Sequence, residues 1–257
     1  MSKPVAIVTG AGSGIGEATA TYLHSLGYKV VIADLNPTSG QRVATALGTD
    51  ALFHQTDVAS YRSQAQLFKR AYEWGGERLD FCHANAGIAE RNKIFDGMDK
   101  EEVDDEGLLK RLGTETMDVN LEAVIQGLWL FKYYVRRSKK AGGGRGCSLP
   151  TLPLYTASKY GVVGLVRGSA PNFIKENITV NAICPGFMST NICPPEILAR
   201  WPKEHITSMS TVIKAIDAFL EDDKLTGQVV ELSQENIYFR QSVDHANRMS
   251  GVQVMFS

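Results

Sequence analysis

The sequence predicts one α/β domain, in which a doubly wound parallel sheet carries helices on both faces. Three observations indicate this fold. Short apolar runs alternate with segments of helical periodicity, no linker interrupts the alternation, and a glycine-rich turn joins the first apolar run to the first helical segment. Residues 1–257 are therefore expected to form a single domain.

The first half of the chain alternates strand and helix. Val5–Val8 is a short apolar run, as expected for a strand buried on both faces, and apolar residues recur at helical spacing from Ile15 to Leu26. Gly27 ends this helix. The elements expected next are strands at 29–33, 51–55 and 79–84 and helices around 38–47 and 62–74.

Two longer helices are expected in the second half of the chain, over residues 116–140 and 155–167. Strands are expected at 177–183 and 227–232. The residues after Asn236 show no clear pattern.

The composition is typical of a globular protein, with 44% hydrophobic residues, 21% charged residues and a net charge of −1. This balance argues against nucleic acid or a membrane surface as a partner. No apolar run is long enough to span a membrane and there is no signal-peptide core, so a cytoplasmic location is expected. The four cysteines lack paired spacing and the five histidines are scattered, so neither disulfides nor a metal site is expected.

A glycine-rich turn spans Thr9–Gly16, between the first strand and the first helix. Its glycines allow the backbone to turn tightly and to approach a pyrophosphate, whose charge the N–H groups of the helix start would stabilise. Ordinary strand-to-helix turns can show the same pattern, but its place here favours the dinucleotide site of a Rossmann-type fold. The residues expected to line the cofactor are Gly10, Gly12, Ser13, Gly14, Ile15 and Gly16.

Asp34 ends the second strand, 18 residues after Gly16. A carboxylate at this position accepts hydrogen bonds from the adenosine ribose and repels a 2′-phosphate. There is no Arg or Lys within the glycine turn or beside Asp34 in the sequence to bind that phosphate. NAD is therefore favoured over NADP, although a surface Asp that opens a turn would give the same local pattern.

Tyr155 and Lys159 are four residues apart at the start of an expected helix, so they share one face. A free tyrosine has a pKa of about 10 and is a poor base at neutral pH. A neighbouring cation favours the phenolate, so Tyr155 could exchange a proton with a carbinol oxygen while hydride moves to or from the cofactor. The pair alone is a weak signal, because a Tyr and a Lys often share a helix face by chance.

Taken together, the motifs resemble those of the short-chain dehydrogenase/reductase family over nearly the whole chain, most closely the branch related to 15-hydroxyprostaglandin dehydrogenase. No single motif is specific, but their order and spacing are. The further matching segments are Asp57-Val58, Asn85-Ala86-Gly87, Asn120 and Pro185–Thr190.

The resemblance implies roles for these residues. Tyr155 would be the catalytic acid or base, and Lys159 would hold the nicotinamide ribose and favour the phenolate. Asn120 would hold a water of the proton relay. The other residues that would line the NAD site are Asp57, Val58, Asn85, Ala86, Gly87, Pro185, Met188 and Thr190.

The interval before Tyr155 departs from the family pattern. The family has a strand that ends at a catalytic Ser, whereas residues 145–154 contain one glycine, two prolines and no β-branched apolar run. Three explanations are open: a true deletion that leaves an impaired or repurposed protein, residues missing from the sequence as read, or Ser148 or Thr151 in place of the Ser. The last two are favoured, because losing a central strand leaves costly unpaired backbone groups.

The expected function is that of an NAD-dependent oxidoreductase, which interconverts a secondary alcohol and a ketone on a hydrophobic small molecule. A homodimer or homotetramer is also expected, because the helices matching 116–140 and 155–167 commonly pack against symmetry mates in this family. The alternatives are a cofactor-binding protein without redox activity, or non-redox chemistry on the same fold. Residues 187–210 are expected to form the substrate wall, through Phe187, Met188, Ile192, Ile197, Leu198, Trp201 and Met209.

Overall fold

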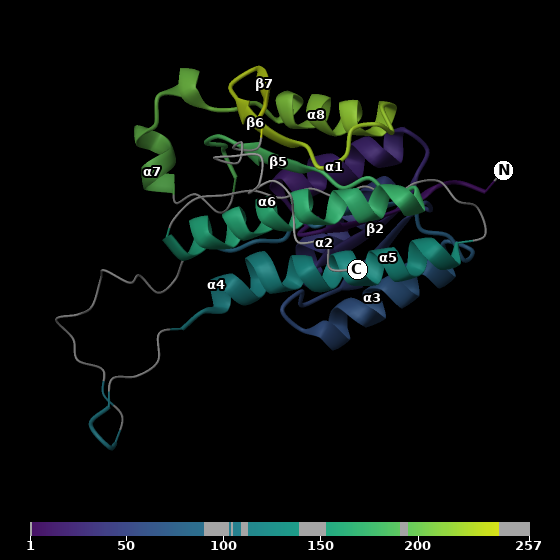
Figure 1. Ribbon diagram of the computed structural model, residues 1–257, viewed down its shortest axis with the longest axis horizontal. Helices are drawn as coiled ribbons and strands as arrows, with labels where there is room; N and C mark the ends of the chain where they lie inside the picture. The colour runs from purple at the N-terminus through teal and green to yellow at the C-terminus, as the bar shows by residue number, and fades with distance from the viewer. Residues whose placement is uncertain are drawn as a thin grey trace, which may run out of the picture.

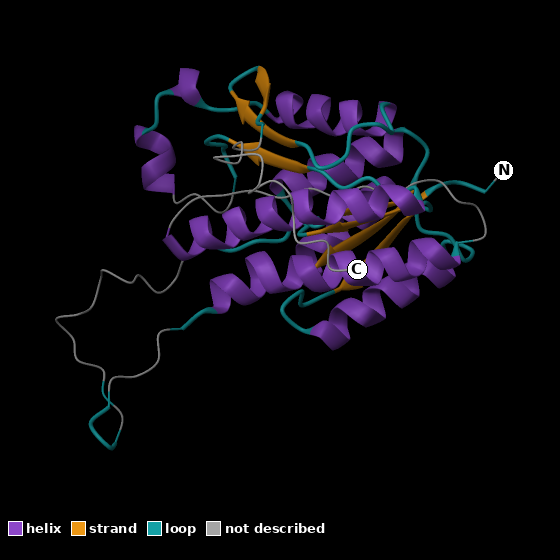
Figure 2. Cartoon of the chain, in the orientation of Figure 1, coloured by secondary structure: helices purple, strands orange, loops and turns teal. Residues whose placement is uncertain are grey.

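The computed structural model describes residues 2–89, 103, 105–108, 113–138, 153–190 and 195–241. Parallel strands lie at the centre of the molecule, and helices cover both of their faces (Figure 1). The strands and the helices around them are seen most easily when the chain is coloured by secondary structure (Figure 2). The fold is the single Rossmann-type α/β domain that the sequence predicts.

Four parallel strands form the first sheet, in the order β3-β2-β1-β4. In the central strand, Ile7 is in register with Val31 on one side and with Cys82 on the other. Every residue of this central strand is buried, which explains why its sequence is continuously apolar at Val5–Val8. The strands are β1 Val5–Thr9, β2 Lys29–Asp34, β3 Ala51–Gln55 and β4 Phe81–His83.

A second sheet has the order β5-β6-β7, over Ala182–Pro185, Val229–Ser233 and Asn236–Phe239. β5 and β6 are parallel, whereas β6 and β7 are antiparallel. The sequence does not predict β7, which pairs with β6 across a tight turn in which Gln234 adopts φ +55°. β5 begins later than the predicted strand at 177–183. Asn177 ends the preceding helical turn in the left-handed conformation, and pairing with β6 begins only at Ala182.

The helices of the first half are close to their predicted positions, and the predicted helix over 116–140 is interrupted by a π-helical turn. The bounds are α1 Gly14–Ser25, α2 Pro37–Leu47, α3 Tyr61–Trp74, α4 Glu115–Met117, the π-helical turn η1 Asp118–Glu122 and α5 Ala123–Arg137.

The helices of the second half differ more from the prediction. α6 runs from Pro153 past the predicted end at 167, because Ala170 and Phe173 are buried against the core. The other elements are α6 Pro153–Phe173, the 3₁₀ turn η2 Ile174–Glu176, α7 Pro195–Arg200, the 3₁₀ turn η3 Lys203–His205 and α8 Met209–Glu221, which the sequence does not predict. Across the described residues, no helix has both the length and the apolar character that crossing a bilayer requires.

Alternate residues of β1 pack into two separate apolar cores, one on each face of the sheet. Ala6 and Val8 belong to a cluster that also contains buried side chains of α1, α2 and α8. Val5 and Ile7 belong to a second cluster, with buried side chains of α3 and α5. The period-2 alternation of a strand therefore produces the three layers of the doubly wound fold.

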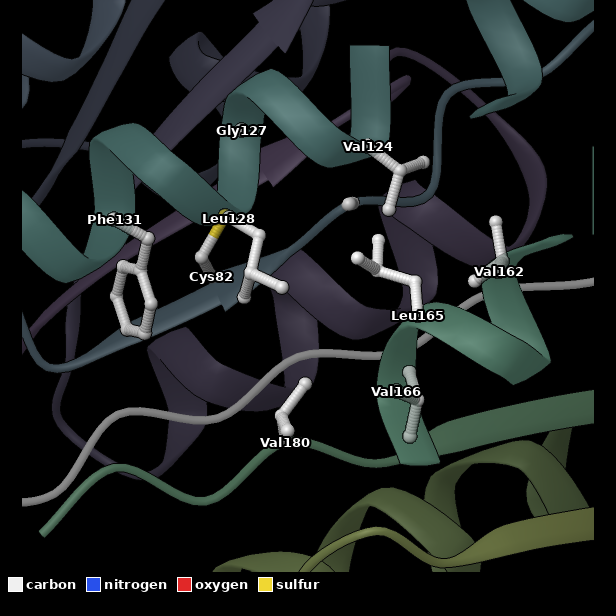
Figure 3. Close-up of a pocket in the computed structure, with 10 residues that line it drawn as sticks. Cys82, Val124, Gly127, Leu128, Phe131, Val162, Leu165, Val166 and Val180 are labelled. Atoms are coloured by element: carbon white, nitrogen blue, oxygen red, sulfur yellow. The ribbon is translucent and has the colours of Figure 1, made fainter. Parts of the chain in front are cut away.

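The two sheets are separated by a gap between β4 and β5. Within the described ranges, β4 pairs with β1 and β5 pairs with β6, and no strand lies between them. A partly open apolar pocket lies here (Figure 3). Ser148 and Thr151, the candidates for the missing hydroxyl, lie outside the described residues. The pocket is lined by Cys82, Ala84, Val124, Gly127, Leu128, Phe131, Val162, Leu165, Val166 and Val180.

Candidate active site

The polar residues of the candidate site lie at the carboxyl end of β1. From β1 the chain passes through α1 to β2 on one side, whereas β4 lies on the other side. Connections that leave a central strand in opposite directions open a crevice at its carboxyl end, where ligands of open α/β sheets bind. The predicted site residues can therefore be followed outward from Thr9.

The glycine turn has space for backbone but not for side chains. Gly10 and Gly14 adopt φ +64° and +56°, which few residues other than glycine tolerate. A Cβ at Gly16 would lie 2.2 Å from the Gly10 carbonyl oxygen, and a Cβ at Gly12 would lie 2.8 Å from Asp34 Oδ2. α1 begins at Gly14 directly after Ser13, so the turn presents a helix start to the crevice.

Asp34 contacts the glycine turn directly. Its Oδ2 accepts a hydrogen bond of 2.7 Å from the Gly12 N–H, and its Oδ1 accepts one of 2.9 Å from the Asn36 N–H. Both bonds hold the carboxylate at the carboxyl end of β2, where the adenosine ribose of a dinucleotide would lie.

The fold brings Arg42 to the glycine turn, which corrects the expectation that no cation is available there. Arg42 lies on α2, and its Nη2 donates a hydrogen bond of 3.1 Å to the Gly12 carbonyl oxygen. No local pattern indicates this contact, because Gly12 and Arg42 are 30 residues apart and meet only through packing.

Thr9 and Asn85 join the ends of β1 and β4. The Asn85 and Ala86 N–H groups each donate a bond of 3.0 Å to Thr9 Oγ1. The Asn85 side-chain amide donates to the carbonyl oxygens of Thr9, at 3.0 Å, and of Gly10, at 3.4 Å. Thr9 is thus a positioning residue that the sequence reasoning did not single out, although it opens the glycine motif.

Lys159 and Asn120 converge on Gly87. A Cβ at Gly87 would lie 3.3 Å from Asn120 Oδ1 and 3.7 Å from Lys159 Nζ. Asn120 is fully buried, and its side chain exchanges two hydrogen bonds of 2.9 Å with the backbone N–H and carbonyl of Ile88. It lies on the π-helical turn, a distortion that often marks functional sites.

Tyr155 lies on α6, four residues before Lys159 and therefore about one turn away along the same helix. The position of its side chain lies outside the described structure. Lys159 is only 5% exposed. A buried ammonium requires compensating interactions, and Lys159 forms a buried polar site together with Asn120.

The remaining predicted residues follow the carboxyl ends of β3 and β5. Asp57 and Val58 follow β3, and Asp57 Oδ1 accepts a bond of 2.9 Å from the Ala59 N–H. Pro185 ends β5, and Met188 is buried. The Thr190 methyl carbon lies 3.6 Å from where a Cβ at Gly14 would be. The segment after β5 therefore faces the glycine turn from the opposite side.

His83 is a buried titratable residue that the sequence reasoning missed. It ends β4, two residues before Asn85, and its Nδ1 has no hydrogen-bond partner among the described residues. Burial, assisted by the positive charge of Lys159, lowers the pKa of His83 to about 4. A polar residue at the end of the short apolar strand was the available signal.

The predicted substrate wall is partly described. The rings of Phe187 and Trp201 stack with centroids 4.3 Å apart, which joins the segment after β5 to the end of α7. Met209 packs against the core on the α1 face. The side chains of Ile192 and Ile197 lie outside the described residues.

The fold and this crevice define a Rossmann-type α/β protein. Its polar residues lie at the switch point, the carboxyl end of β1 where the connections leave in opposite directions. A family model described as short chain dehydrogenase matches residues 4–197. The chain is 32% identical to a short-chain dehydrogenase/reductase of Penicillium rubens, over 91% of this chain and 85% of that one. The chain therefore belongs to the short-chain dehydrogenase/reductase family of oxidoreductases.

Other relatives agree with the predicted branch and fold. The chain is 30% identical to the 15-hydroxyprostaglandin dehydrogenase (NAD(+)) of Homo sapiens, over 92% of this chain and 93% of that one. The crystal structure of 3-hydroxyacyl-CoA dehydrogenase type-2 from Mycobacterium avium superposes with a TM-score of 0.74 and 28% identity, over 90% and 94% of the two chains. A 3-ketoacyl-(acyl-carrier-protein) reductase from Brucella melitensis, complexed with NADH, shares the fold with a TM-score of 0.73 and 23% identity, over 90% and 96%.

Proposed function

We propose that this protein is an NAD-dependent oxidoreductase that interconverts a secondary alcohol and a ketone on a hydrophobic small molecule. The observation that carries the proposal is the convergence of Lys159, Asn120 and Gly87 at the switch point, with Tyr155 one helical turn before Lys159. A cation and a tyrosine on one helix face provide a proton-transfer pair beside the cofactor crevice.

The glycine turn fits a bound dinucleotide. At Gly10, Gly12 and Gly16 a Cβ would collide with atoms of the protein itself, so glycine lets the chain form a tight cradle. The helix start at Gly14 presents backbone N–H groups to which a pyrophosphate could bind. Asp34 supports NAD rather than NADP, because its carboxylate lies at the ribose end of this cradle and would repel a 2′-phosphate. The human relative named for NAD(+) supports the same choice.

In this proposal the chain's own residues position the reactants and move the proton. Bound NAD would supply the hydride acceptor for the alcohol carbon. Tyr155 takes the alcohol proton in oxidation and returns it in reduction. Lys159 holds the nicotinamide ribose and provides positive charge beside Tyr155. Asn120 keeps the Ile88 backbone in place through its paired hydrogen bonds.

The substrate side is supported by the apolar character of residues 187–210. The stacked pair Phe187 and Trp201 offers an aromatic surface to a hydrophobic molecule. Free thiols at Cys82 and Cys184 support a reducing, cytoplasmic environment.

The test is a paired assay of binding and turnover. NADH binding is followed by fluorescence, and NADH formation is followed at 340 nm with NAD and a panel of secondary alcohols, about ten compounds that range from short alkanols to steroids and hydroxy fatty acids. We expect binding and turnover of at least one hydrophobic alcohol, and reduction of the matching ketone with NADH.

Binding without any turnover would contradict the proposal and favour a cofactor-binding protein. The transcript should also be sequenced across the region that encodes Gly144–Tyr155. If the transcript encodes an additional strand and Ser there, their loss would explain an inactive chain. The chain with these residues restored would then be assayed for turnover.

A further inference from the structure

Arg42 is held in a two-pronged ion pair at the ribose end of the crevice. Its Nη1 lies 2.9 Å from Glu17 Oε1, and its Nη2 lies 2.7 Å from Glu17 Oε2. Glu17 lies in the first turn of α1 and Arg42 lies on α2, so the pair links the two helices. A planar guanidinium binds a carboxylate and a phosphate through the same fork of N–H groups.

The same guanidinium and Asp34 hold Gly12 from two sides. Arg42 Nη2 donates to the Gly12 carbonyl, and the Gly12 N–H donates to Asp34 Oδ2. A Cβ at Gly12 would lie only 2.4 Å from Ser39 Oγ, so the Ser39 hydroxyl is also at this position. A guanidinium and a hydroxyl are the side chains that bind phosphate, yet two carboxylates, Glu17 and Asp34, lie among them.

We propose that Glu17 is a second determinant of cofactor specificity, because it occupies the Arg42 fork and withholds it from the 2′-phosphate of NADP. Asp34 repels the phosphate directly, whereas Glu17 acts through Arg42 and is a positioning residue. This inference rests on the proposed NAD-binding function and deepens it. It assigns NADP discrimination to two carboxylates, one on α1 and one at the end of β2, and not to Asp34 alone.

Asp34 and Glu17 are expected to have coupled effects on NADPH affinity. With Asp34 present, removing Glu17 should raise NADPH affinity little, because the Asp34 carboxylate still repels the 2′-phosphate. With Asp34 neutralised, Arg42 still has both donors on Glu17. Removal of both carboxylates takes the Glu17 partner from both nitrogens and leaves the Gly12 carbonyl bonded to Nη2. The guanidinium can then pair with a phosphate beside Ser39, so the effects of the two substitutions should exceed their sum.

The test uses the full-length chain and fluorescence titrations with NADH and NADPH. We expect Asp34→Asn to weaken NADH binding and Glu17→Ala alone to change NADPH affinity less than about threefold. The double variant should bind NADPH about tenfold more tightly than Asp34→Asn does. Adding Arg42→Ala to the double variant should remove this gain.

The matched control is Glu73→Ala, which removes an exposed carboxylate paired with Lys69 on α3 and should leave both affinities unchanged. A double variant with no tighter NADPH binding than Asp34→Asn overturns the inference, as does a gain that persists without Arg42. Failure of the wild-type chain to bind either nucleotide is a separate result, which would refute the proposed function itself.

Discussion

Lys159 shows how much a single residue depends on the fold around it. The spacing of Tyr155 and Lys159 predicts a shared helix face, but not that the lysine is 5% exposed and lies beside Gly87 and Asn120. An ammonium that is buried beside an amide and a glycine is restricted in position, whereas a surface lysine moves freely. Substitutions at this pair should therefore separate proton transfer from cofactor binding.

We expect Tyr155→Phe to abolish turnover and to leave NADH binding within about twofold of wild type, since only a hydroxyl is removed. Lys159→Ala should reduce both turnover and NADH affinity, because the ribose contact and the cation are lost together. Steady-state rates and NADH fluorescence titrations would measure the two effects. Wild-type rates in Tyr155→Phe would show that another group transfers the proton.

His83 should make the stability of the protein depend on pH. Its pKa is lowered from the ordinary 6.5 to about 4 in the folded protein, so between these values the unfolded chain binds more protons. The free energy of unfolding should therefore fall as the pH falls from 6.5 to 4, by up to about 1.4 kcal/mol per pH unit from this group.

Urea unfolding of the wild type and of His83→Phe at pH 7.5, 6.0 and 5.0 would measure this dependence. Carboxylates titrate in the same range, so the informative quantity is the difference between the two proteins. We expect His83→Phe to lose less stability on acidification, since a ring without a proton site replaces a buried imidazole whose Nδ1 has no partner among the described residues. Parallel curves for the two proteins would contradict this.

At the scale of elements, the glycine turn was predicted from sequence almost completely, because its order of strand, glycines and helix is local. The π-helical turn that carries Asn120 was not predicted. Its pattern of apolar residues is that of an ordinary helix, and the distortion accompanies a reciprocal pair of hydrogen bonds between Asn120 and the backbone of Ile88, 32 residues away. α8 and β7 were missed for a related reason, since tertiary contacts stabilise short segments with weak local signals.

Two glycines with opposite surroundings test the role of the turn. Gly16→Ala places a Cβ 2.2 Å from the Gly10 carbonyl, so the turn must shift, and NADH affinity should fall at least about tenfold. Gly164→Ala, on the exposed side of α6 and away from the turn, meets nothing within 4 Å in its own chain and should leave NADH affinity unchanged. Thermal unfolding and NADH titration would check both. Unchanged NADH affinity in Gly16→Ala would show that the turn does not hold the cofactor.

At the scale of the whole molecule, α5 and α6 leave large apolar side chains in solvent. Trp129 is 63% exposed and Tyr133 is 47% exposed on α5, and Tyr160 is 72% exposed on α6. Exposed apolar side chains on adjacent helices are typical of a surface that pairs with another copy. We therefore expect a homodimer or homotetramer in solution.

Trp129→Lys should shift this assembly toward the monomer, because a charge would be buried at the contact. Leu26→Lys is the matched control, since Leu26 is 48% exposed at the end of α1, on the opposite face of the sheet. Light scattering across a range of concentrations would measure both. A monomeric wild type, or equal masses for the wild type and Trp129→Lys, would refute the assignment.

The sequence by itself determined the layered α/β fold, the glycine turn, the Asp34 position and the spacing of Tyr155 and Lys159. Each of these is encoded by short-range periodicity or by residues within a few positions of one another. Only the tertiary structure decided that Arg42 reaches Gly12, that Thr9 joins Asn85, and that His83 lies buried near Lys159. The apolar pocket between β4 and β5 is likewise visible only in the tertiary structure. These contacts join residues tens of positions apart, and packing of whole elements sets them, so no local pattern specifies them.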